Sequence, residues 1–295
     1  MITGTFLDDI SPDLPSLNFG PEEWTREFAA MKADGIDTVV LSRAGYRDRA
    51  VFDSKVLRTL HPHLIVQDDM LALYLSLAGQ NGMNFWVATY ESGEHWENGQ
   101  YQKEFDQNRR LADEMWERYG RSRAFRGWFV AQDVDTRNEA AMRAFESYSN
   151  HVRQLSALPI LLAPHLSCGS SLHPNYERET DDVFARLAGL AQVLSFEDGD
   201  VSLADLPAWV STNARLAKKH GFTTWSNLES FDRDVPTKFP PIAWPKLRYK
   251  MESALSASVD KLITFEYSHF LSQHSLHNSA HALHKRYREW LATQK

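Results

Sequence analysis

Cysteine and long apolar runs are almost absent from this sequence. The single cysteine, Cys168, excludes a disulfide within the chain and fits a reducing compartment. No segment approaches the roughly 18 consecutive apolar residues that a membrane-spanning helix needs. Met1 leads directly into a run of strand length, without the charged and apolar regions of a signal peptide. We therefore expect a cytoplasmic protein with no membrane partner.

Positive charge is scarce as well. The net charge is -7, from 32 Lys and Arg against 39 Asp and Glu, and no long basic run is present. Such a chain repels a phosphate backbone, so we expect no nucleic-acid partner. The length of 295 residues, with 43% hydrophobic residues, suits one domain spanning residues 1–295. The remaining expectation is a small neutral ligand and no cofactor, and the sequence leaves assembly into a homo-oligomer open.

The sequence does contain eight short apolar runs that are typical of β-strands. Each ends in a polar cluster, and six of these clusters include a carboxylate. The runs are Ile2 to Asp9, Asp37 to Arg43, Asn84 to Glu91, Phe125 to Asp133, Pro159 to His165, Gln192 to Asp198, Phe222 to Glu229 and Lys261 to His269.

Stretches with the 3.6-residue periodicity of helices lie between most of the strands and after the last one. The first is opened by Pro21 and ended by Gly35. The others are Asp68 to Gln80, Glu104 to Tyr119, Asn138 to Leu155, Glu177 to Leu190, Leu206 to His220, Trp244 to Ala257 and Ser279 to Leu291. This alternation predicts an α/β fold, a single (β/α)8 TIM barrel.

The loops that follow the strands are where a barrel of this kind carries its active site. Three of them are long, at residues 44–66, 91–103 and 230–243, and loops of this length are usually functional. The residues that carry chemistry are therefore expected at the strand ends.

The strand ends gather the side chains that a sugar-binding cleft needs. Carboxylates and amides bond sugar hydroxyls, whereas aromatic rings cover the apolar faces of pyranose rings. The predicted substrate-binding residues are Asp9, Arg43, Tyr46, Tyr90, Glu91, Trp96, Gln132, His165, Asp198, Asn227 and His269. Trp96 and Tyr46 are the strongest candidates for stacking, because they lie in polar loops.

Glycoside hydrolysis needs two carboxyl groups, of which one holds a proton near neutral pH while the other stays ionised. Alternate residues of a strand share a face, so Asn227 and Glu229 lie on one side of the seventh strand. Thr264 and Glu266 share one side of the eighth strand in the same way. We therefore predict that Glu229 and Glu266 face the barrel interior.

Several segments resemble a bacterial family of glycosidase-like TIM barrels catalogued as domain of unknown function 4434. The resemblance covers essentially the whole chain. It rests on GTFLDDIS (Gly4 to Ser11), AGYRDR (Ala44 to Arg49), ERYGRSRAFRGWFVAQD (Glu117 to Asp133), NLESFDRD (Asn227 to Asp234) and ITFEYSHF (Ile263 to Phe270). The resemblance implies a relative of glycoside hydrolases, with an acid/base after strand four and a nucleophile after strand seven. Asp133 and Glu229 would take those two roles.

The fourth strand departs from the pattern of related barrels. Those barrels generally carry Glu after an amide, whereas this chain has Gln132 followed by Asp133, and parity does not decide which of the two points inward. Aspartate is one methylene shorter than glutamate. Either the separation of the two carboxyl groups grows from about 5 to 5.5 Å toward the roughly 6.5 to 9.5 Å of inverting enzymes, or Asp133 only binds substrate.

The sequence thus predicts a glycoside hydrolase acting on a small oligosaccharide or glycoside, with Glu229 and Asp133 as the principal pair and Glu266 in reserve. Two alternatives stay open. In a metal-dependent sugar isomerase or epimerase, Glu91, Asp133, His165 and Glu229 would hold a divalent cation, although no local motif such as H-E-x-x-H supports a metal site. A barrel that binds carbohydrate without converting it is also compatible with the sequence.

Overall fold

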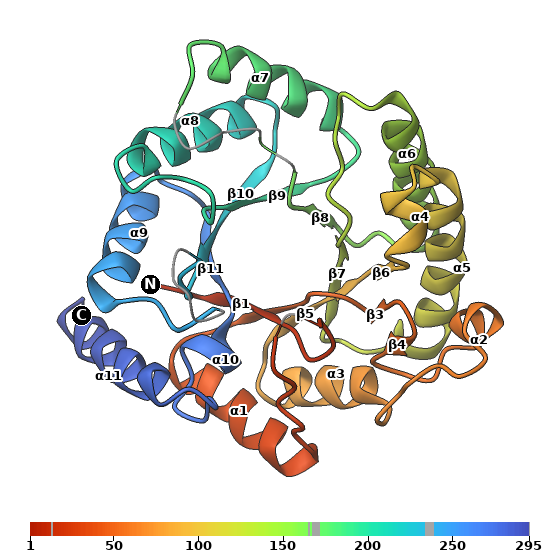
Figure 1. Cartoon of the computed structure of the whole chain (residues 1–295), viewed down its shortest axis with the longest axis horizontal. Helices are drawn as coiled ribbons and strands as arrows, with labels where there is room; N and C mark the ends of the chain where they lie inside the picture. The colour runs from red at the N-terminus through yellow and green to blue at the C-terminus, as the bar shows by residue number, and fades with distance from the viewer. Residues whose placement is uncertain (13, 165, 167–171, 234–238, 295) are drawn as a thin grey trace.

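The computed structural model describes residues 1–12, 14–164, 166, 172–233 and 239–294. Eight parallel strands close into a barrel, and helices surround it (Figure 1). Around the barrel the strands follow one another as β1-β2-β5-β7-β8-β9-β10-β11. They are β1 (Gly4–Leu7), β2 (Thr38–Leu41), β5 (Asn84–Ala88), β7 (Phe125–Val130), β8 (Ile160–Leu162), β9 (Val193–Glu197), β10 (Thr223–Glu229) and β11 (Lys261–Phe265). The predicted (β/α)8 barrel is confirmed.

The long helices lie where helical periodicity predicted them. They are α1 (Pro21–Ala33), α3 (Met70–Gln80), α5 (Tyr101–Tyr119), α6 (Glu139–Leu155), α7 (Tyr176–Leu187), α8 (Leu206–Lys219), α9 (Trp244–Ser256) and α11 (Asn278–Thr293). Side-chain caps fix the starts of α3 and α6, where Asp69 and Asn138 accept hydrogen bonds from the first turn. The Asn138 side chain, for example, accepts hydrogen bonds from the backbone N–H groups of Ala140 and Ala141 and so fixes the first turn of α6.

The loops after β2 and β5 contain short elements that periodicity did not predict. A small three-stranded sheet joins them, with β6 (Tyr90–Glu91) and β4 (Arg49–Ala50) on either side of β3 (Gly45–Tyr46). The short helices are α2 (Lys55–Leu60), α4 (Glu94–Glu97) and α10 (Tyr267–Phe270). Elements of two to six residues are too short to show a hydrophobic period, so tertiary contacts decide them.

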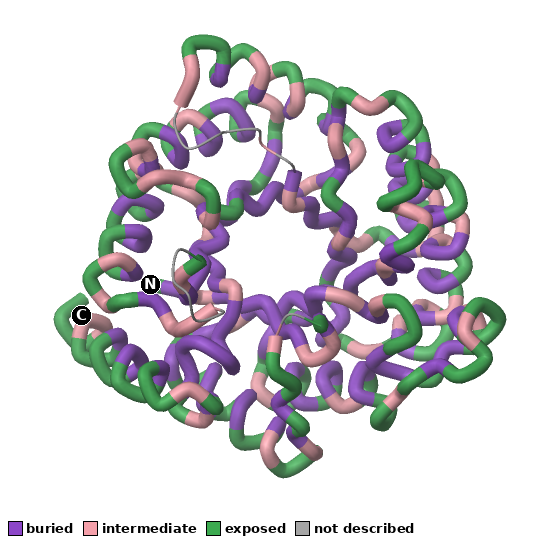
Figure 2. The backbone as a smooth tube through the Cα atoms, in the orientation of Figure 1, coloured by how far each residue is buried: buried purple, intermediate pink, exposed green. Residues whose placement is uncertain are grey.

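Aromatic side chains pack across the interior of the barrel. The ring centroids of Trp86 and Trp225 lie 5.2 Å apart, and Phe6 and Phe129 meet edge to face at 5.1 Å. Gly127 makes room for this packing, because a Cβ there would lie 2.2 Å from the Trp86 ring. Figure 2 accordingly shows a buried barrel wall, with exposed positions mainly on the outer helices and loops. These side chains leave no open channel through the barrel at this level.

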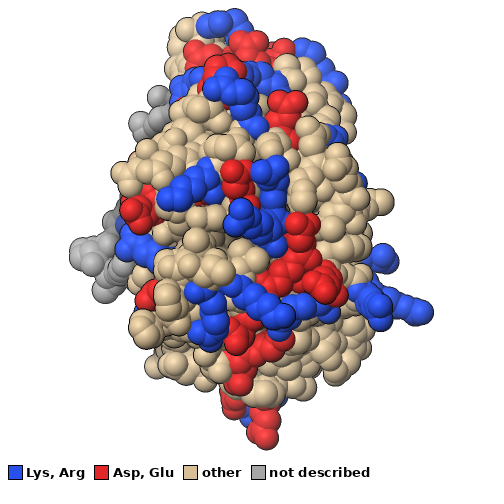
Figure 3. Space-filling model, turned by 90° about the vertical axis from the view of Figure 1, so that its right-hand side faces the viewer, with Lys and Arg blue, Asp and Glu red and all other residues tan. Residues whose placement is uncertain are grey.

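The outer surface shows mixed charge. On the face in Figure 3, basic and acidic side chains lie among each other without an extended region of one sign. Within the described ranges, none of the helices combines the length and apolarity that spanning a membrane requires.

Candidate active site

A cavity of about 200 Å3 lies at the C-terminal ends of the barrel strands. Its lining is drawn from strand ends and loops that are far apart in sequence. The lining residues are Asp8, Leu14, Arg43, Glu197, Asn227, Glu229, Phe231, Arg233, Phe239 and Phe265. Arg43, Asn227 and Glu229 are the three predicted site residues among them. Because (β/α)8 enzymes carry their active sites at this end of the barrel, the cavity is the candidate active site.

Glu229 ends β10 and lines the cavity together with Asn227, as strand parity predicted. Its side chain is buried, and the Arg233 guanidinium donates two N–H bonds to the carboxylate, of which the bond from Nε to Oε2 is 2.8 Å. Burial raises the pKa of Glu229, and the bonds and charge of Arg233 oppose that rise. The guanidinium thus favours the ionised carboxylate inside the cavity.

Gly199 lies directly against the Glu229 carboxylate. A Cβ built on Gly199 would lie 2.2 Å from Glu229 Oε1 and 2.5 Å from Oε2. No other residue type fits here without moving the carboxylate, so the loop after β9 helps to set its position.

Asp198 lies behind Glu229 and is not among the residues that line the cavity, so its role in substrate binding stays a prediction that the cavity does not support. Its Oδ1 accepts hydrogen bonds from the backbone N–H of Glu229 at 3.0 Å and from Lys250 Nζ at 2.9 Å. Lys250 Nζ also donates to the Glu229 carbonyl oxygen at 3.3 Å. The buried pair of Asp198 and Lys250 therefore fixes the main chain that carries Glu229.

Glu197, the neighbour of Asp198, faces the cavity instead, and the sequence analysis left it out of the site. Strand alternation narrows the choice to one of the two, since Glu197 is the last residue of β9 and its successor must point the other way, but it does not decide between them. The Glu197 side chain is exposed to solvent through the cavity. The protein packed around the carboxylate and the neighbouring carboxylates nevertheless disfavour its charge. Burial and the charges of Glu229 and Asp133 raise the pKa of Glu197 to about 7, against the opposing charge of Arg233.

Asn227 lies between these two acids in the sheet. Its Cα pairs in register with that of Glu197 on β9, and Glu229 follows two residues later on β10. The residue is 1% exposed and lines the cavity. Its Oδ1 is buried and has no hydrogen-bond partner among the described residues. An orphaned buried acceptor of this kind is a place where a ligand donor can bind.

Arg43 lines the cavity from the end of β2. Its guanidinium lies 3.2 Å from Asp8 Oδ2 and also donates to Glu91 Oε2. Glu91 does not line the cavity. Burial raises its pKa, and Arg43 opposes this rise. Tyr46 lies next to Arg43, with 5.6 Å from the guanidinium carbon to the ring centroid, and it also stands outside the cavity lining.

The end of β7 resolves the ambiguity about Gln132 and Asp133. Gln132 is buried, and it bonds Thr89 Oγ1 at 2.8 Å and Glu104 Oε1 at 3.1 Å, away from the cavity. Asp133 is exposed. Its charge acts on Glu197, so it belongs to the rim of the same site. Gln132 therefore supports the fold, and Asp133 is the residue of this pair whose charge acts on Glu197.

Glu266 does not face the barrel interior, so that prediction is wrong. Strand β11 ends at Phe265, and Phe265 is the side chain that lines the cavity. The Glu266 carboxylate caps α10, accepting from the N–H groups of Ser268 at 2.9 Å and His269 at 2.8 Å. The first backbone N–H groups of a helix need hydrogen-bond acceptors, and this explains why the carboxylate turns away from the cavity.

His269 is buried against Glu266 and also lies outside the cavity lining. Its Nδ1 bonds the Glu266 carboxylate, and its Nε2 bonds the Pro15 carbonyl oxygen at 2.8 Å. Burial by itself lowers the pKa of His269, but the charge and hydrogen bond of Glu266 and the bond to Pro15 raise it to about 9. A ring with two acceptors must donate from both nitrogens, which is the charged form. His269 therefore holds the loop after β1, and both of its ring nitrogens are engaged within the protein, so its contact with substrate stays a prediction that this geometry does not support.

Two predicted aromatic residues are packed into the fold. Tyr90 is fully buried, and its hydroxyl donates to the Arg47 carbonyl oxygen at 2.8 Å. Trp96 lies on α4, where it meets Tyr101 at 4.7 Å and Phe105 at 5.8 Å between ring centroids. Both rings stabilise the loop after β5, and neither lines the cavity.

Asp9 and His165 complete the list of predicted residues. Asp9 lines a separate hollow of about 130 Å3 and lies 3.3 Å from the Tyr74 hydroxyl. Burial raises the pKa of Asp9 to about 6, with the Tyr74 hydrogen bond opposing. His165 lies outside the described residues.

The metal-binding alternative can be tested against the charges around its proposed ligands. Glu91 bonds Arg43, and Glu229 bonds Arg233. A guanidinium on the carboxylate repels a divalent cation from the same oxygens. In the described part of the chain, no group of three or more His, Cys, Asp or Glu residues is arranged to hold a metal ion.

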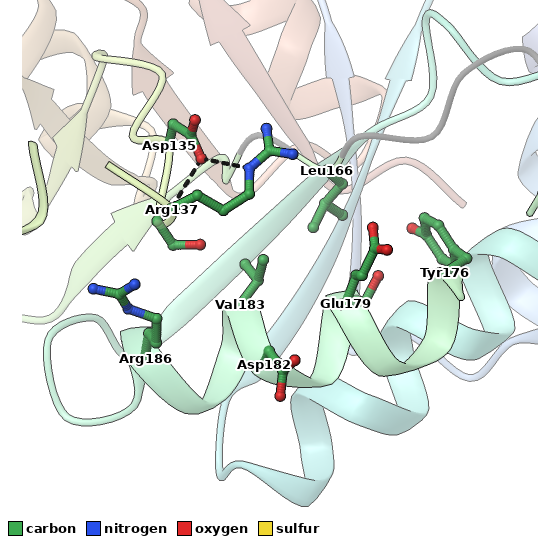
Figure 4. A pocket seen from close by; sticks show the side chains of 10 residues that line it. Asp135, Arg137, Leu166, Tyr176, Glu179, Asp182, Val183 and Arg186 are labelled. Carbon is green, nitrogen blue, oxygen red and sulfur yellow. Dashed lines mark hydrogen bonds and ion pairs between the residues drawn. The ribbon is translucent and has the colours of Figure 1, made fainter. Parts of the chain in front are cut away.

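A larger hollow of about 340 Å3 lies between the loop after β7 and helix α7 (Figure 4). Most of the charged side chains that line this hollow form ion pairs. Arg137 Nε lies 3.0 Å from Asp135 Oδ1, and Arg186 reaches Glu139 at 2.6 Å. This hollow shares no lining residue with the active-site cavity.

The fold and the acid-rich cavity define the class of this protein as a glycosidase-like (β/α)8 barrel. The model of a family described as domain of unknown function, DUF4434, matches residues 2–277, and the chain belongs to this family. No curated protein matches the chain.

Solved structures similar to this chain are TIM-barrel proteins. A candidate alpha-L-fucosidase from Bacteroides thetaiotaomicron VPI-5482 is 36% identical, with a TM-score of 0.91 over 98% of this chain and 92% of that one. An endo-1,4-beta-D-mannanase from Thermotoga petrophila RKU-1 is 10% identical, with a TM-score of 0.60 over 90% and 88% of the two chains. A GH99 endo-alpha-mannosidase from Bacteroides thetaiotaomicron is 11% identical, with a TM-score of 0.53 over 90% and 84%. The two distant likenesses concern the fold alone.

Proposed function

We propose that this protein is a glycoside hydrolase that acts on a small oligosaccharide or glycoside through Glu197 and Glu229. One observation carries the proposal. Three carboxyl groups line one small cavity, those of Asp8, Glu197 and Glu229. The surroundings of the two glutamates differ: a guanidinium holds Glu229, whereas the pKa of Glu197 is raised to about 7. Unequal environments of two acids are what acid and base roles in glycoside hydrolysis require.

Glu197 would act as the acid that protonates the glycosidic oxygen, and Glu229 as the nucleophile at the anomeric carbon. Water then releases the sugar from Glu229, with Glu197 acting as the base. The sheet supports this pairing. Glu197 is in register with Asn227, and Glu229 follows two residues later, so the two Cα atoms lie about 8 Å apart by strand spacing and rise. Both side chains reach the same cavity.

The family resemblance gives the acid role to Asp133 instead. We place Asp133 at the rim, because it does not line the cavity and because its charge raises the pKa of Glu197. Glu266 leaves the set of catalytic candidates, since it caps α10.

The size of the cavity supports a small substrate. About 200 Å3 is below the roughly 300 to 1,000 Å3 of pockets for drug-sized ligands. A single sugar residue therefore suits the closed part of the site, with the leaving group directed outward. The candidate alpha-L-fucosidase, which covers nearly the whole chain at 36% identity, also supports action on a terminal sugar.

The test is turnover of a panel of 4-nitrophenyl glycosides by the full chain and by isosteric variants. We expect Glu229→Gln and Glu197→Gln each to lower kcat by at least about a hundredfold, the lower end for loss of a general acid or base. Glu252→Gln, an exposed glutamate of α9, is the matched control and should leave turnover unchanged.

The same panel separates the competing assignments. A loss with Asp133→Asn as large as with Glu229→Gln, together with a mild effect of Glu197→Gln, would return the acid role to Asp133. Sugar binding without turnover of any glycoside would overturn the hydrolase and leave a carbohydrate-binding barrel. Proton NMR of the first product would detect retention at the anomeric carbon, as the nucleophile role of Glu229 requires.

A further inference from the structure

The loop after β1 forms part of the wall of the active-site cavity. Asp8 at its start and Leu14 near its middle both line the cavity. For residues 9–12 and 14–19, which the structure describes, no hydrogen bond joins their backbone groups to another described backbone group. A wall without backbone pairing keeps its shape only where side chains hold it.

One set of side chains holds the start of this loop. Asp8 Oδ1 accepts a hydrogen bond from the backbone N–H of Ser11 at 3.0 Å. The Arg43 guanidinium lies 3.2 Å from Asp8 Oδ2. These contacts fix the loop as far as Ser11, so Leu14, three residues further on, needs a separate support.

His269 supplies that support. Its Nε2 bonds the carbonyl oxygen of Pro15, the residue next to Leu14, at 2.8 Å. Proline has no N–H, so this carbonyl oxygen is the one backbone group through which a hydrogen bond can hold Pro15. The next hydrogen bond that reaches the described loop from outside it comes from Gln67 Nε2, at 3.3 Å from the Phe19 carbonyl oxygen.

The imidazole of His269 is itself held in place. The residue is fully buried, and its Nδ1 and its backbone N–H both bond the Glu266 carboxylate, the N–H at 2.8 Å. The Ser275 hydroxyl donates to the His269 carbonyl oxygen. A buried ring with these contacts cannot follow a moving loop, so the loop takes its position from the ring.

The charge of the ring makes both ring bonds possible. Burial lowers the pKa of His269, but the Glu266 carboxylate, the bond to Pro15 and the charge of Asp8 raise it to about 9. Both ring nitrogens therefore donate near neutral pH. A glutamine at this position has a single side-chain nitrogen beside an oxygen, so it cannot place a donor at each of the two acceptors.

We infer that His269 is a positioning residue of the active site, which holds the Pro15 carbonyl oxygen and thereby keeps Leu14 at the cavity wall. Substrate affinity then depends on this hydrogen bond, although the ring touches no substrate. The inference deepens the proposed function and rests on it, because the affinity concerns the glycoside bound beside Glu197 and Glu229.

Steady-state kinetics of His269→Gln test the inference on the 4-nitrophenyl glycoside that the parent cleaves fastest. We expect KM to rise about tenfold while kcat stays within about threefold, because the wall serves the bound substrate and the transition state alike. Loss of folded protein alone would lower the apparent kcat and leave KM unchanged. An unchanged KM would overturn the inference. His151→Gln, at a histidine that pairs with Asp113 between α5 and α6, is the matched control and should leave both constants unchanged.

Variants of Leu14 show whether the effect passes through this side chain. Leu14→Ala by itself should raise KM by a similar factor, and an unchanged KM in it would overturn the inference even if His269→Gln does not fold. The double variant should have the KM of Leu14→Ala within about twofold, because the two residues serve one contact. Rises in KM that multiply in the double variant would contradict the route through Leu14. Melting temperatures verify that each variant is folded at the assay temperature.

The outcomes for the two proposals differ. Cleavage of glycosides by the parent, with an unchanged KM in His269→Gln, would remove this inference and leave the hydrolase. A parent that cleaves no glycoside would remove the hydrolase, and limited digestion with thermolysin then tests the support of the wall. Cutting within residues 14–19 should be at least about tenfold faster in His269→Gln than in the parent and in His151→Gln, with cutting elsewhere unchanged. Equal rates would overturn the inference.

Discussion

Lys250 Nζ and Asp198 Oδ1 lie 2.9 Å apart in an ion pair buried directly behind Glu229. Both groups also bond the Glu229 main chain, the lysine at the carbonyl oxygen and the aspartate at the N–H. One buried pair therefore holds the residue that we propose as nucleophile, and it links helix α9 to the loop after β9. Rigid support of this kind is what keeps a catalytic group within the narrow geometry of reaction.

Removing one partner of this pair should be costly. We expect Lys250→Met to lower the free energy of unfolding by about 3 to 5 kcal/mol, because Asp198 would remain buried with its charge uncompensated. The measurement is urea unfolding. Adding Asp198→Asn to Lys250→Met should recover part of the lost free energy of unfolding. If Lys250→Met alone unfolds within about 1 kcal/mol of the parent, the buried pairing is contradicted.

Gly199→Ala should damage turnover more than stability. The added Cβ would overlap the Glu229 carboxylate, and a displacement of about 1 Å at a reacting group costs on the order of a hundredfold in rate. Gly79→Ala is the matched control, since a Cβ at this helical position of α3 lies 4.0 Å from its nearest neighbour. The readouts are kcat and melting temperature. A Gly199→Ala enzyme with parental kcat would show that the carboxylate is not confined as described.

The pH profile of kcat/KM should report the titration of the Glu197 carboxyl group. As the proposed acid it must be protonated, so activity should fall above a pH of about 7, by about tenfold for each further pH unit. Asp133→Asn removes a charge that raises this pKa and should move the alkaline limb to lower pH. Arg233→Met removes an opposing charge and should move it to higher pH. If kcat/KM falls at the same alkaline pH in the parent, Asp133→Asn and Arg233→Met, Glu197 is excluded as the titrating group.

Stability should depend on pH through His269. Its pKa is about 9 in the fold against an ordinary 6.5, so its stabilisation is complete below about pH 6.5 and is lost as the pH rises through 9. The shift corresponds to about 3 kcal/mol at most. Urea unfolding across this pH range should show that the free energy of unfolding declines with pH in the parent and does not decline in the same way in His269→Gln. If the free energy of unfolding depends on pH in the same way in both proteins, the titration of His269 does not contribute to stability.

Much of the fold was predictable because its signals are local. Each barrel strand is a short apolar run, and each long helix shows a 3.6-residue period with recognisable ends, so neighbours in sequence suffice to define them. The largest errors in the helix ends are three residues, at the start of α5, predicted at Glu104 and observed at Tyr101, and at the end of α7, predicted at Leu190 and observed at Leu187.

The site was predictable in part. Parity placed Asn227 and Glu229 in the cavity because both lie within β10, where alternation is regular. Parity misled at Glu266, because β11 ends one residue earlier and the start of α10 binds the carboxylate. At the end of β9 the choice between Glu197 and Asp198 depended on Lys250, which is 52 residues away from Asp198 in the chain.

The sequence by itself determined the class of fold, the face of the barrel that carries the chemistry and the identity of Glu229 as a cavity residue, because periodicity and strand ends are local properties. The tertiary structure alone decided which carboxylates are free to face the cavity. Arg43 binds Glu91 from 48 residues away in the chain, and Lys250 binds Asp198 from 52 residues away. Long-range pairing of this kind leaves no periodic signal, so only the folded chain separates the acids that support the barrel from those at its mouth.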